Sequence, residues 1–196
     1  APLKIAALES IRPLAQKVND HIVKFRRNDT EELIRRQADL HYRGYDVDSY
    51  LLNCCCHRFG SGEAKATVNE SVRGADIFAM VDVTNHSLTY NISGYTNHMS
   101  PDDHYQDLKR IIGACQATAH RVNVIMPFLY ESRQHKRTHR ESLDCAMALQ
   151  ELIQMGVSNI ITFDAHDPRV QNAIPLSGFD NFMPTYQFVK ALFSHD

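Results

Sequence analysis

Hydrophobic residues near the start of the chain recur every three or four positions, which is the spacing of one face of an α-helix. They are Ile11, Leu14, Ala15, Val18, Ile22 and Phe25. Charged and polar residues fill the positions between them and continue through the stretch 26–36. We therefore expect an amphipathic first helix that packs its apolar stripe on a core and exposes the opposite face.

The hydrophobic pattern changes at Tyr50. The run "YLLNCCC" is compact and apolar and precedes a polar pair and glycines, which is typical of a buried strand. Three more strand-like runs follow, at Asp76–Val83, Val122–Met126 and Asn159–Phe163. Each is short, and a helical or polar segment separates it from the next.

Helices are expected between these runs. Ser100 suits the cap of a helix that begins at Pro101, because its hydroxyl accepts from a free backbone amide and proline fits the first turn. Two more helices are expected, over Ser142–Met155 and over Thr185–Phe193. The polar segment 84–99 has no clear period, and we expect a long loop or an irregular hairpin there.

The alternation of strands and helices predicts an α/β fold with a mostly parallel sheet flanked by helices. A chain of 196 residues is long enough for one such core, so we expect a single domain over 1–196. Parallel sheets bind ligands at the loops that follow the carboxyl ends of their strands. The candidate ligand-binding loops therefore follow Cys56, Met126 and Phe163.

Composition narrows the functional classes. The chain has 21 Lys and Arg against 23 Asp and Glu, so it offers no broad basic surface for nucleic acid. Its apolar runs fall far below the roughly 20 residues of a membrane span, and its first residues lack the apolar core of a secretory signal. Five cysteines, three of them contiguous, do not indicate a disulfide framework. We expect a cytoplasmic protein that contacts neither nucleic acid nor membrane.

The loop after the last predicted strand carries residues suited to a metal ion. Asp164 and His166 lie two positions apart, so both side chains leave one face if the strand continues through them. With Asp167 they offer carboxylates and an imidazole to a divalent cation beside phosphates. Alternatively, Asp167 caps a short helix opened by Pro168, and His166 is an ordinary loop residue. A third possible function is a metal-dependent phosphoryl hydrolase built on the Asp164/His166 pair, but the pair lacks the additional carboxylates that such a site usually needs.

The loop after Met126 is strongly basic. Its cations are Arg133, Lys136, Arg137 and Arg140. Arginine offers a rigid fork of donors and lysine a mobile charge, a combination suited to polyphosphate. A solvated surface loop has the same composition, and that interpretation stays open.

The segment "RFGSGE" follows the cysteine run. Phe59 has a ring that can stack on a base, Glu63 can accept from an exocyclic amine, and glycines permit close backbone approach. A tight turn between strands explains Gly60 and Gly62 equally well. No Gly-Lys-Ser/Thr follows, so the segment is not a Walker loop.

The three adjacent cysteines favour packing over chemistry. In a strand, Cys54 and Cys56 point to one face and Cys55 to the other, so they cannot easily supply one tetrahedral zinc site. Core packing is therefore the preferred interpretation, with metal or redox chemistry as the alternative.

Several blocks, in order along the chain, resemble the amino-terminal half of ribose-phosphate diphosphokinases, the phosphoribosyl pyrophosphate synthetases. They are "LAQKVNDHI", "RFGSGE", "NESVRGADIF", "SRQHKR", and "NIITFDAHDPRVQ" with "GFDN". Members of that family look like two phosphoribosyltransferase-type α/β domains in tandem, and this chain resembles the first. The resemblance implies that a carboxy-terminal domain binding ribose 5-phosphate lies outside residues 1–196.

The resemblance also implies an activity, the transfer of the diphosphoryl group of ATP to ribose 5-phosphate with release of AMP and with Mg²⁺ as cofactor. This chain alone would not catalyse the reaction. Phe59 would stack on adenine, with Ser61 and Glu63 on its polar edge. Arg133 and Gln134 would contact the phosphates and base of ATP.

The resemblance assigns the metal to His166, with Asp164 and Asp180 in support. Ser61 stands where the family usually has Asp or Asn, and His135 where Asp usually follows the Arg-Gln pair. Family nucleotide sites form between subunits, so a homo-oligomer is expected. The alternative function is a non-catalytic regulatory homologue that binds nucleotide and assembles with active subunits.

Overall fold

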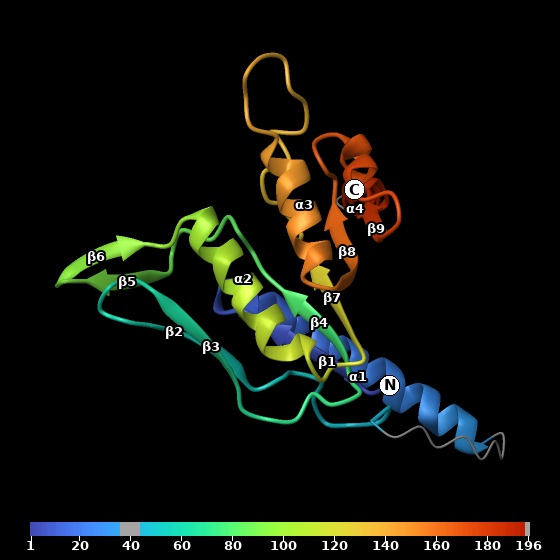
Figure 1. The fold of residues 1–196 in the computed structure, drawn as a ribbon. Helices are drawn as coiled ribbons and strands as arrows, with labels where there is room; N and C mark the ends of the chain where they lie inside the picture. The colour runs from blue at the N-terminus through green and yellow to red at the C-terminus, as the bar shows by residue number, and fades with distance from the viewer. Residues whose placement is uncertain (36–43, 195–196) are drawn as a thin grey trace.

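A computed structural model describes residues 1–35 and 44–194 (Figure 1). Its centre is a five-stranded sheet in the order β1-β4-β7-β8-β9, in which each neighbouring pair is parallel. The strands are β1 (Leu3–Ala7), β4 (Asp76–Met80), β7 (Arg121–Ile125), β8 (Val157–Phe163) and β9 (Gly178–Phe182). The expected α/β fold with a mostly parallel sheet is therefore confirmed.

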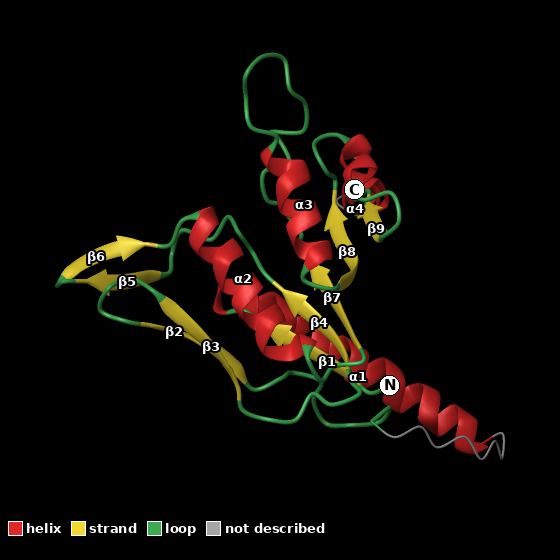
Figure 2. Ribbon diagram, viewed as in Figure 1, coloured by secondary structure: helices red, strands yellow, loops and turns green. Residues whose placement is uncertain are grey.

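Helices flank this sheet (Figure 2). On one face, the helix α1 (Arg12–Arg35) packs near Ile5 and Met80. Strand residues that alternate with these point to the opposite face, because successive side chains of a strand point to opposite sides. There they form the larger core with α2 (Pro101–Gln116) and α3 (Asp144–Gln154). Two short 3-10 helices, Glu9–Ile11 (η1) and Pro168–Ala173 (η2), follow β1 and β8.

Local signals set the helix ends. α2 begins at Pro101 as predicted, and Ser100 and Asp103 form a capping box in which each side chain accepts from the other's backbone amide. α4 (Thr185–Phe193) has the predicted bounds, and all its residues are exposed. α1 confirms the expected first helix from Arg12 onward, but Leu14 and Phe25 of its predicted apolar stripe are 45% and 63% exposed, so the stripe is only partly buried. Position 36 of the charged stretch lies outside the described residues.

The run from Tyr50 does not form a strand of the central sheet, contrary to the prediction. It meets the edge of β1 only briefly, where the Ile5 amide donates to the Tyr50 carbonyl at 2.7 Å and the Leu52 amide to the Ile5 carbonyl at 2.8 Å. β2 (Cys54–Arg58) then pairs antiparallel with β3 (Ala64–Val68). One face of such a hairpin stays accessible, unlike a strand buried between helices. The loop after β2 is therefore not at the carboxyl edge of the central sheet.

The polar segment 84–99 contains a second hairpin, which is one of its two expected forms. It consists of β5 (Thr89–Ile92) and β6 (Tyr95–His98), and it extends away from the central sheet (Figure 1). β1 and β9 are not among the predicted strands. Over residues 1–35 and 44–194, no helix combines the length and apolar character needed to cross a membrane.

Candidate functional site

The turn between β2 and β3 presents an aromatic ring to solvent. Phe59 is 48% exposed. The turn closes on itself, since the Gly62 amide donates to the Phe59 carbonyl at 2.9 Å and the Phe59 amide to the Glu63 carbonyl at 2.7 Å. The Ser61 hydroxyl donates to the Glu63 carboxylate at 2.9 Å. The three side chains predicted to contact adenine thus share one exposed turn, which we call the Phe59 turn (residues 59–63).

The loop after β7 exposes cations and is tied together by Gln134. The Gln134 side-chain amide donates to the Ser142 carbonyl at 2.8 Å, and the Cys145 amide donates to the Gln134 carbonyl at 3.3 Å. Arg133 is exposed, and no ion pair joins it to another of the described side chains. Its guanidinium is therefore free to meet an anion. The other exposed cations of this loop are Lys136, Arg137 and Arg140.

The loop after β8 combines parts of both interpretations of its sequence. β8 ends at Phe163 and Asp164 has a φ of 47°, so the strand does not continue through His166. The side chains of Asp164 and His166 are nevertheless both exposed. Asp167 caps η2 by accepting from the Arg169 amide at 2.9 Å. Its hydrogen bonds from Arg169 hold the pKa of Asp167 well below its usual range.

His135 connects these two loops and was not among the predicted site residues. Its Nε2 lies 3.3 Å from Asp167 Oδ2, and its ring meets the edge of the His166 ring with centroids 5.2 Å apart. Its Nδ1 is buried without a hydrogen-bond partner among the described residues. In the sequence, His135 is recognisable only as an imidazole beside the Arg-Gln pair. Its approach to Asp167 depends on the fold.

Asp180 lies apart from the other predicted metal ligands. The Asn159 side-chain amide donates to it at 2.6 Å, and it pairs in register with Ile161, before the end of β9. In the described parts of the chain, no three His, Cys, Asp or Glu side chains converge to hold a metal ion by themselves. A Mg²⁺ site made of one or two carboxylates and substrate phosphates needs no such cluster. The exposed Asp164 carboxylate, two residues from His166, suits a site of that kind.

The predicted residues form two groups. The loops after β7 and β8 meet through His135 and His166 at the carboxyl ends of neighbouring strands. The Phe59 turn lies on the β2–β3 hairpin, outside the central sheet. Among the described residues, no hydrogen bond, ion pair or ring contact joins that turn to either loop.

The cysteine triplet follows the alternation expected of a strand. Cys54 is buried in the core and Cys56 packs against it. Cys55 points to the other face, where its Sγ lies 3.0 Å from His57 Nε2 and 3.1 Å from Thr67 Oγ1. Burial raises the pKa of the Cys54 thiol to about 11 and that of Cys56 to about 12.

A thiol reagent at pH 8 should therefore label Cys55 first. Burial also raises the pKa values of Cys115 and Cys145 to about 11, which leaves about one reactive thiolate in a thousand molecules at pH 8. Brief treatment with iodoacetamide followed by peptide mass spectrometry measures the order of labelling. In urea all five cysteines should react alike, and faster native labelling of Cys54 or Cys56 than of Cys55 would contradict the expectation.

Comparison with known proteins matches this chain to one family. The model of the N-terminal domain of ribose phosphate pyrophosphokinase matches residues 3–156. The chain is 26% identical over 171 residues to the ribose-phosphate pyrophosphokinase of Staphylococcus saprophyticus and 25% identical over 158 residues to that of Corynebacterium ammoniagenes. These alignments cover 86% and 80% of this chain but only 41% and 44% of the relatives. The chain therefore spans less than half the length of these curated relatives.

A solved structure has the same fold. The phosphoribosylpyrophosphate synthetase from Mycobacterium smegmatis superposes with a TM-score of 0.71 at 19% sequence identity, over 100% of this chain and 53% of that chain. Because the family model covers residues 3–156 of 196, the chain belongs to the family of N-terminal domains of ribose phosphate pyrophosphokinases.

Proposed function

We propose that this chain is the nucleotide-binding half of a ribose-phosphate diphosphokinase. In the complete protein, the anomeric hydroxyl of ribose 5-phosphate forms a bond to the β-phosphorus of ATP. The bond from that phosphorus to the α,β-bridging oxygen breaks, AMP leaves, and the hydroxyl proton is released. The ribose 5-phosphate site belongs to a second domain, so this chain alone binds ATP weakly and does not turn over.

The contact between His135 and His166 carries the proposal. It joins the loop that exposes Arg133 to the loop that exposes Asp164. Both loops follow parallel strands at their carboxyl ends, which is the edge where α/β sheets bind ligands. Exposed cations and an exposed carboxylate at one edge suit a polyphosphate that arrives with a divalent cation.

The chain's own residues supply charge and orientation. The Arg133 guanidinium neutralises negative charge that shifts between oxygens during transfer, and its fork of donors matches two phosphate oxygens. Gln134 keeps the basic loop closed, so the cations stay in place. Asp164 and His166 would hold Mg²⁺, which neutralises phosphate charge when bound. Asp180, hydrogen-bonded to Asn159, would act only by fixing β9 against β8.

The separation of the Phe59 turn from the loops after β7 and β8 supports an oligomer. One nucleotide contacts both groups of residues if a second copy of the chain supplies the turn. The exposed ring of Phe59 then stacks on adenine, with Ser61 and Glu63 on the polar edge of the base.

Exposed apolar side chains near the end of the chain support a further domain. Phe163 on β8 is 45% exposed and Phe182 on β9 is 53% exposed. α4 adds further exposed apolar residues, namely Phe188, Val189, Leu192 and Phe193. Apolar surface of this extent favours a covering partner.

The experiment is an assay of the complete gene product for AMP formation. AMP formation should require both ribose 5-phosphate and Mg²⁺. The variant His166→Asn should need about tenfold more Mg²⁺ for half-maximal rate, which is the scale of losing one metal-positioning group. The matched control is His21→Asn, which changes an exposed histidine of α1.

Other outcomes would replace the proposal. ATP binding without AMP formation would favour the non-catalytic regulatory homologue. An unchanged Mg²⁺ requirement in His166→Asn would remove His166 from the metal site, and a protein that binds no ATP would overturn the nucleotide-binding role altogether.

A further inference from the structure

We infer that the β5–β6 hairpin positions the Phe59 turn, which makes Tyr90 and Ile92 positioning residues of the nucleotide site. This inference rests on the proposed role of Phe59 in stacking on the base. It assigns a task to the segment 84–99.

Direct packing against Gly62 is the first observation. Along β5, Tyr90 and Ile92 are half-buried while Thr89 and Asn91 are exposed, so one face of the hairpin is turned inward. Gly62 has a φ of +90°, which favours glycine. A methyl group on Gly62 would lie 2.8 Å from Ile92 Cδ1 and 3.6 Å from Tyr90 Cε2. The glycine thus allows the turn to approach the hairpin.

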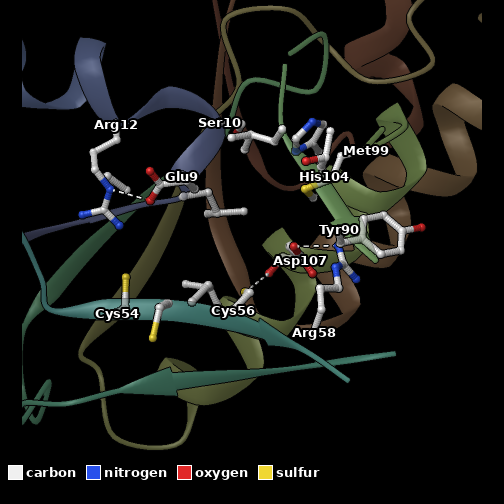
Figure 3. A pocket seen from close by; sticks show the side chains of 16 residues that line it. Glu9, Ser10, Arg12, Cys54, Cys56, Arg58, Tyr90, Met99, His104 and Asp107 are labelled. Carbon is white, nitrogen blue, oxygen red and sulfur yellow. Dashed lines mark hydrogen bonds and ion pairs between the residues drawn. The ribbon is translucent and has the colours of Figure 1, made fainter. Parts of the chain in front are cut away.

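Arg58 links the same hairpin to the same turn. Its guanidinium carbon lies 4.9 Å from the centre of the Tyr90 ring, within the range of a cation–π interaction. Its Nη1 donates to the Gly62 carbonyl at 3.4 Å, and its Nη2 donates to the Asp107 carboxylate of α2 at 2.9 Å. Figure 3 shows these side chains close together. One partly buried arginine therefore contacts β5, the turn and α2.

The base of the hairpin is anchored to the body of the protein. The Asn85 side-chain amide donates to the Ser10 carbonyl at 2.9 Å, and His104 Nε2 lies 2.6 Å from the Asn85 carbonyl. At the same base, the Met99 amide donates to the Leu88 carbonyl at 2.8 Å and closes the hairpin. These contacts fix where Tyr90 and Ile92 meet the turn.

The pocket beneath the hairpin does not explain this arrangement. It is lined by η1, β2, β5 and α2 (Figure 3). Its charged side chains are already paired, Glu9 with Arg12 and Arg58 with Asp107. The largely buried Arg58–Asp107 pair favours a structural role over binding of a charged ligand.

Holding the turn should act on binding more than on chemistry. A glycine-containing turn without support samples many conformations, and ordering it on binding costs conformational entropy. A turn that is already ordered avoids this cost. Loss of the hairpin contacts should therefore raise the KM for ATP and leave kcat nearly unchanged.

The first test needs no nucleotide. The chain contains no tryptophan, so Phe59→Trp introduces one fluorophore at the turn of this 196-residue chain. Adding Tyr90→Leu or Ile92→Ala should lower the fluorescence anisotropy of that tryptophan and increase its quenching by acrylamide. Tyr90→Phe, which keeps the ring over Arg58, and Asn91→Ala, on the exposed face of β5, are the matched controls and should leave both values unchanged.

The second test uses the complete gene product. Tyr90→Leu and Ile92→Ala should each raise the KM for ATP about tenfold, equivalent to about 1.4 kcal/mol, while kcat and melting temperature change little. Gly62→Ala should weaken ATP binding less in the Ile92→Ala background than alone, because the contact at Ile92 is relieved there.

The outcomes separate this inference from the proposed function. If Phe59→Ala weakens ATP binding but Tyr90→Leu and Ile92→Ala change neither KM nor the fluorescence, the hairpin inference is wrong and the proposed function stands. A fluorescence change in a protein that binds no ATP would leave the hairpin as support for the turn and refute its role in nucleotide binding. A fall in kcat with unchanged KM would also refute that role.

Discussion

Replacing Arg133 by alanine should lower kcat/KM of the complete gene product for AMP formation by about 100- to 1,000-fold, the usual cost of losing one preorganised donor to developing charge. Arg133 is exposed at the carboxyl edge of the sheet, and Gln134 holds its loop closed. Its removal therefore takes away a fixed charge without disturbing a buried partner. Steady-state assays with ATP and ribose 5-phosphate measure the loss.

Two variants test whether the effect comes from the guanidinium itself. Lys17→Ala removes an exposed charge from α1 and should leave the rate unchanged. Arg133→Lys keeps the charge but loses the rigid fork of donors, so its rate should fall between those of wild type and Arg133→Ala. If Arg133→Ala retains at least half of the wild-type rate, the loop after β7 does not bind the transferring group.

The start of α2 and the bounds of α4 were predictable because their causes are local, whereas α3 begins at Asp144, two residues after the predicted start, and has no side-chain cap. The start of α2 depends on Ser100, Pro101 and Asp103, which are neighbours in the chain. The bounds of α4 likewise agree with its apolar spacing. Such signals act within one turn, so they can be recognised without knowing the fold.

Strand partners were not predictable because they are set elsewhere in the chain. The apolar run from Tyr50 suits either a central strand or a hairpin, and the pairing of Cys54 with Val68 decides between them. β1 is a short strand just before the helical pattern begins, and nothing local distinguishes it from the approach to the helix. β9 has the sequence "GFDNF", in which two adjacent polar residues separate the phenylalanines, so only its pairing with β8 identifies it as a strand.

The residue types of the candidate site could be predicted from the sequence, but their arrangement in space could not. The exposed cations and Phe59 lie on loops, as their composition indicates. The sequence left open whether Asp167 caps a helix, and its hydrogen bonds from Arg169 make it a cap. The approach of His135 to His166 joins residues from two separate loops, so no local pattern contains it.

A second large effect is expected on stability, from the buried carboxylate of Asp107. Its two oxygens accept from Arg58 Nη2 at 2.9 Å and from Arg110 Nη1 at 2.6 Å, and its side chain is 8% exposed. Asp107→Ala leaves the Arg58 guanidinium, itself 14% exposed, without its closest anion. Removing one partner of a buried pair costs about 3 kcal/mol. Urea unfolding of this chain should show a loss of that size.

The matched control is an exposed pair with the same spacing. Glu9 and Arg12 are three residues apart, as Asp107 and Arg110 are. Their charged atoms lie 2.8 Å from each other, but their side chains are 64% and 47% exposed. Glu9→Ala should therefore change the free energy of unfolding by at most about 0.5 kcal/mol, since water and salt screen such a pair. Equal losses in Glu9→Ala and Asp107→Ala would mean that burial does not set the energy of these ion pairs.

Two further variants identify the source of the loss at Asp107. Burial raises the pKa of Asp107, because it penalises the charged form more than the neighbouring arginines favour it. Asp107→Asn keeps an acceptor for Arg58 without the buried negative charge, so it should destabilise less than Asp107→Ala. Arg58→Met combined with Asp107→Ala should cost less than the two single changes added together, because no unpaired arginine remains at position 58. Strict additivity would show instead that Arg58 and Asp107 stabilise the fold independently, and that their contact contributes no coupling energy between α2 and the Phe59 turn.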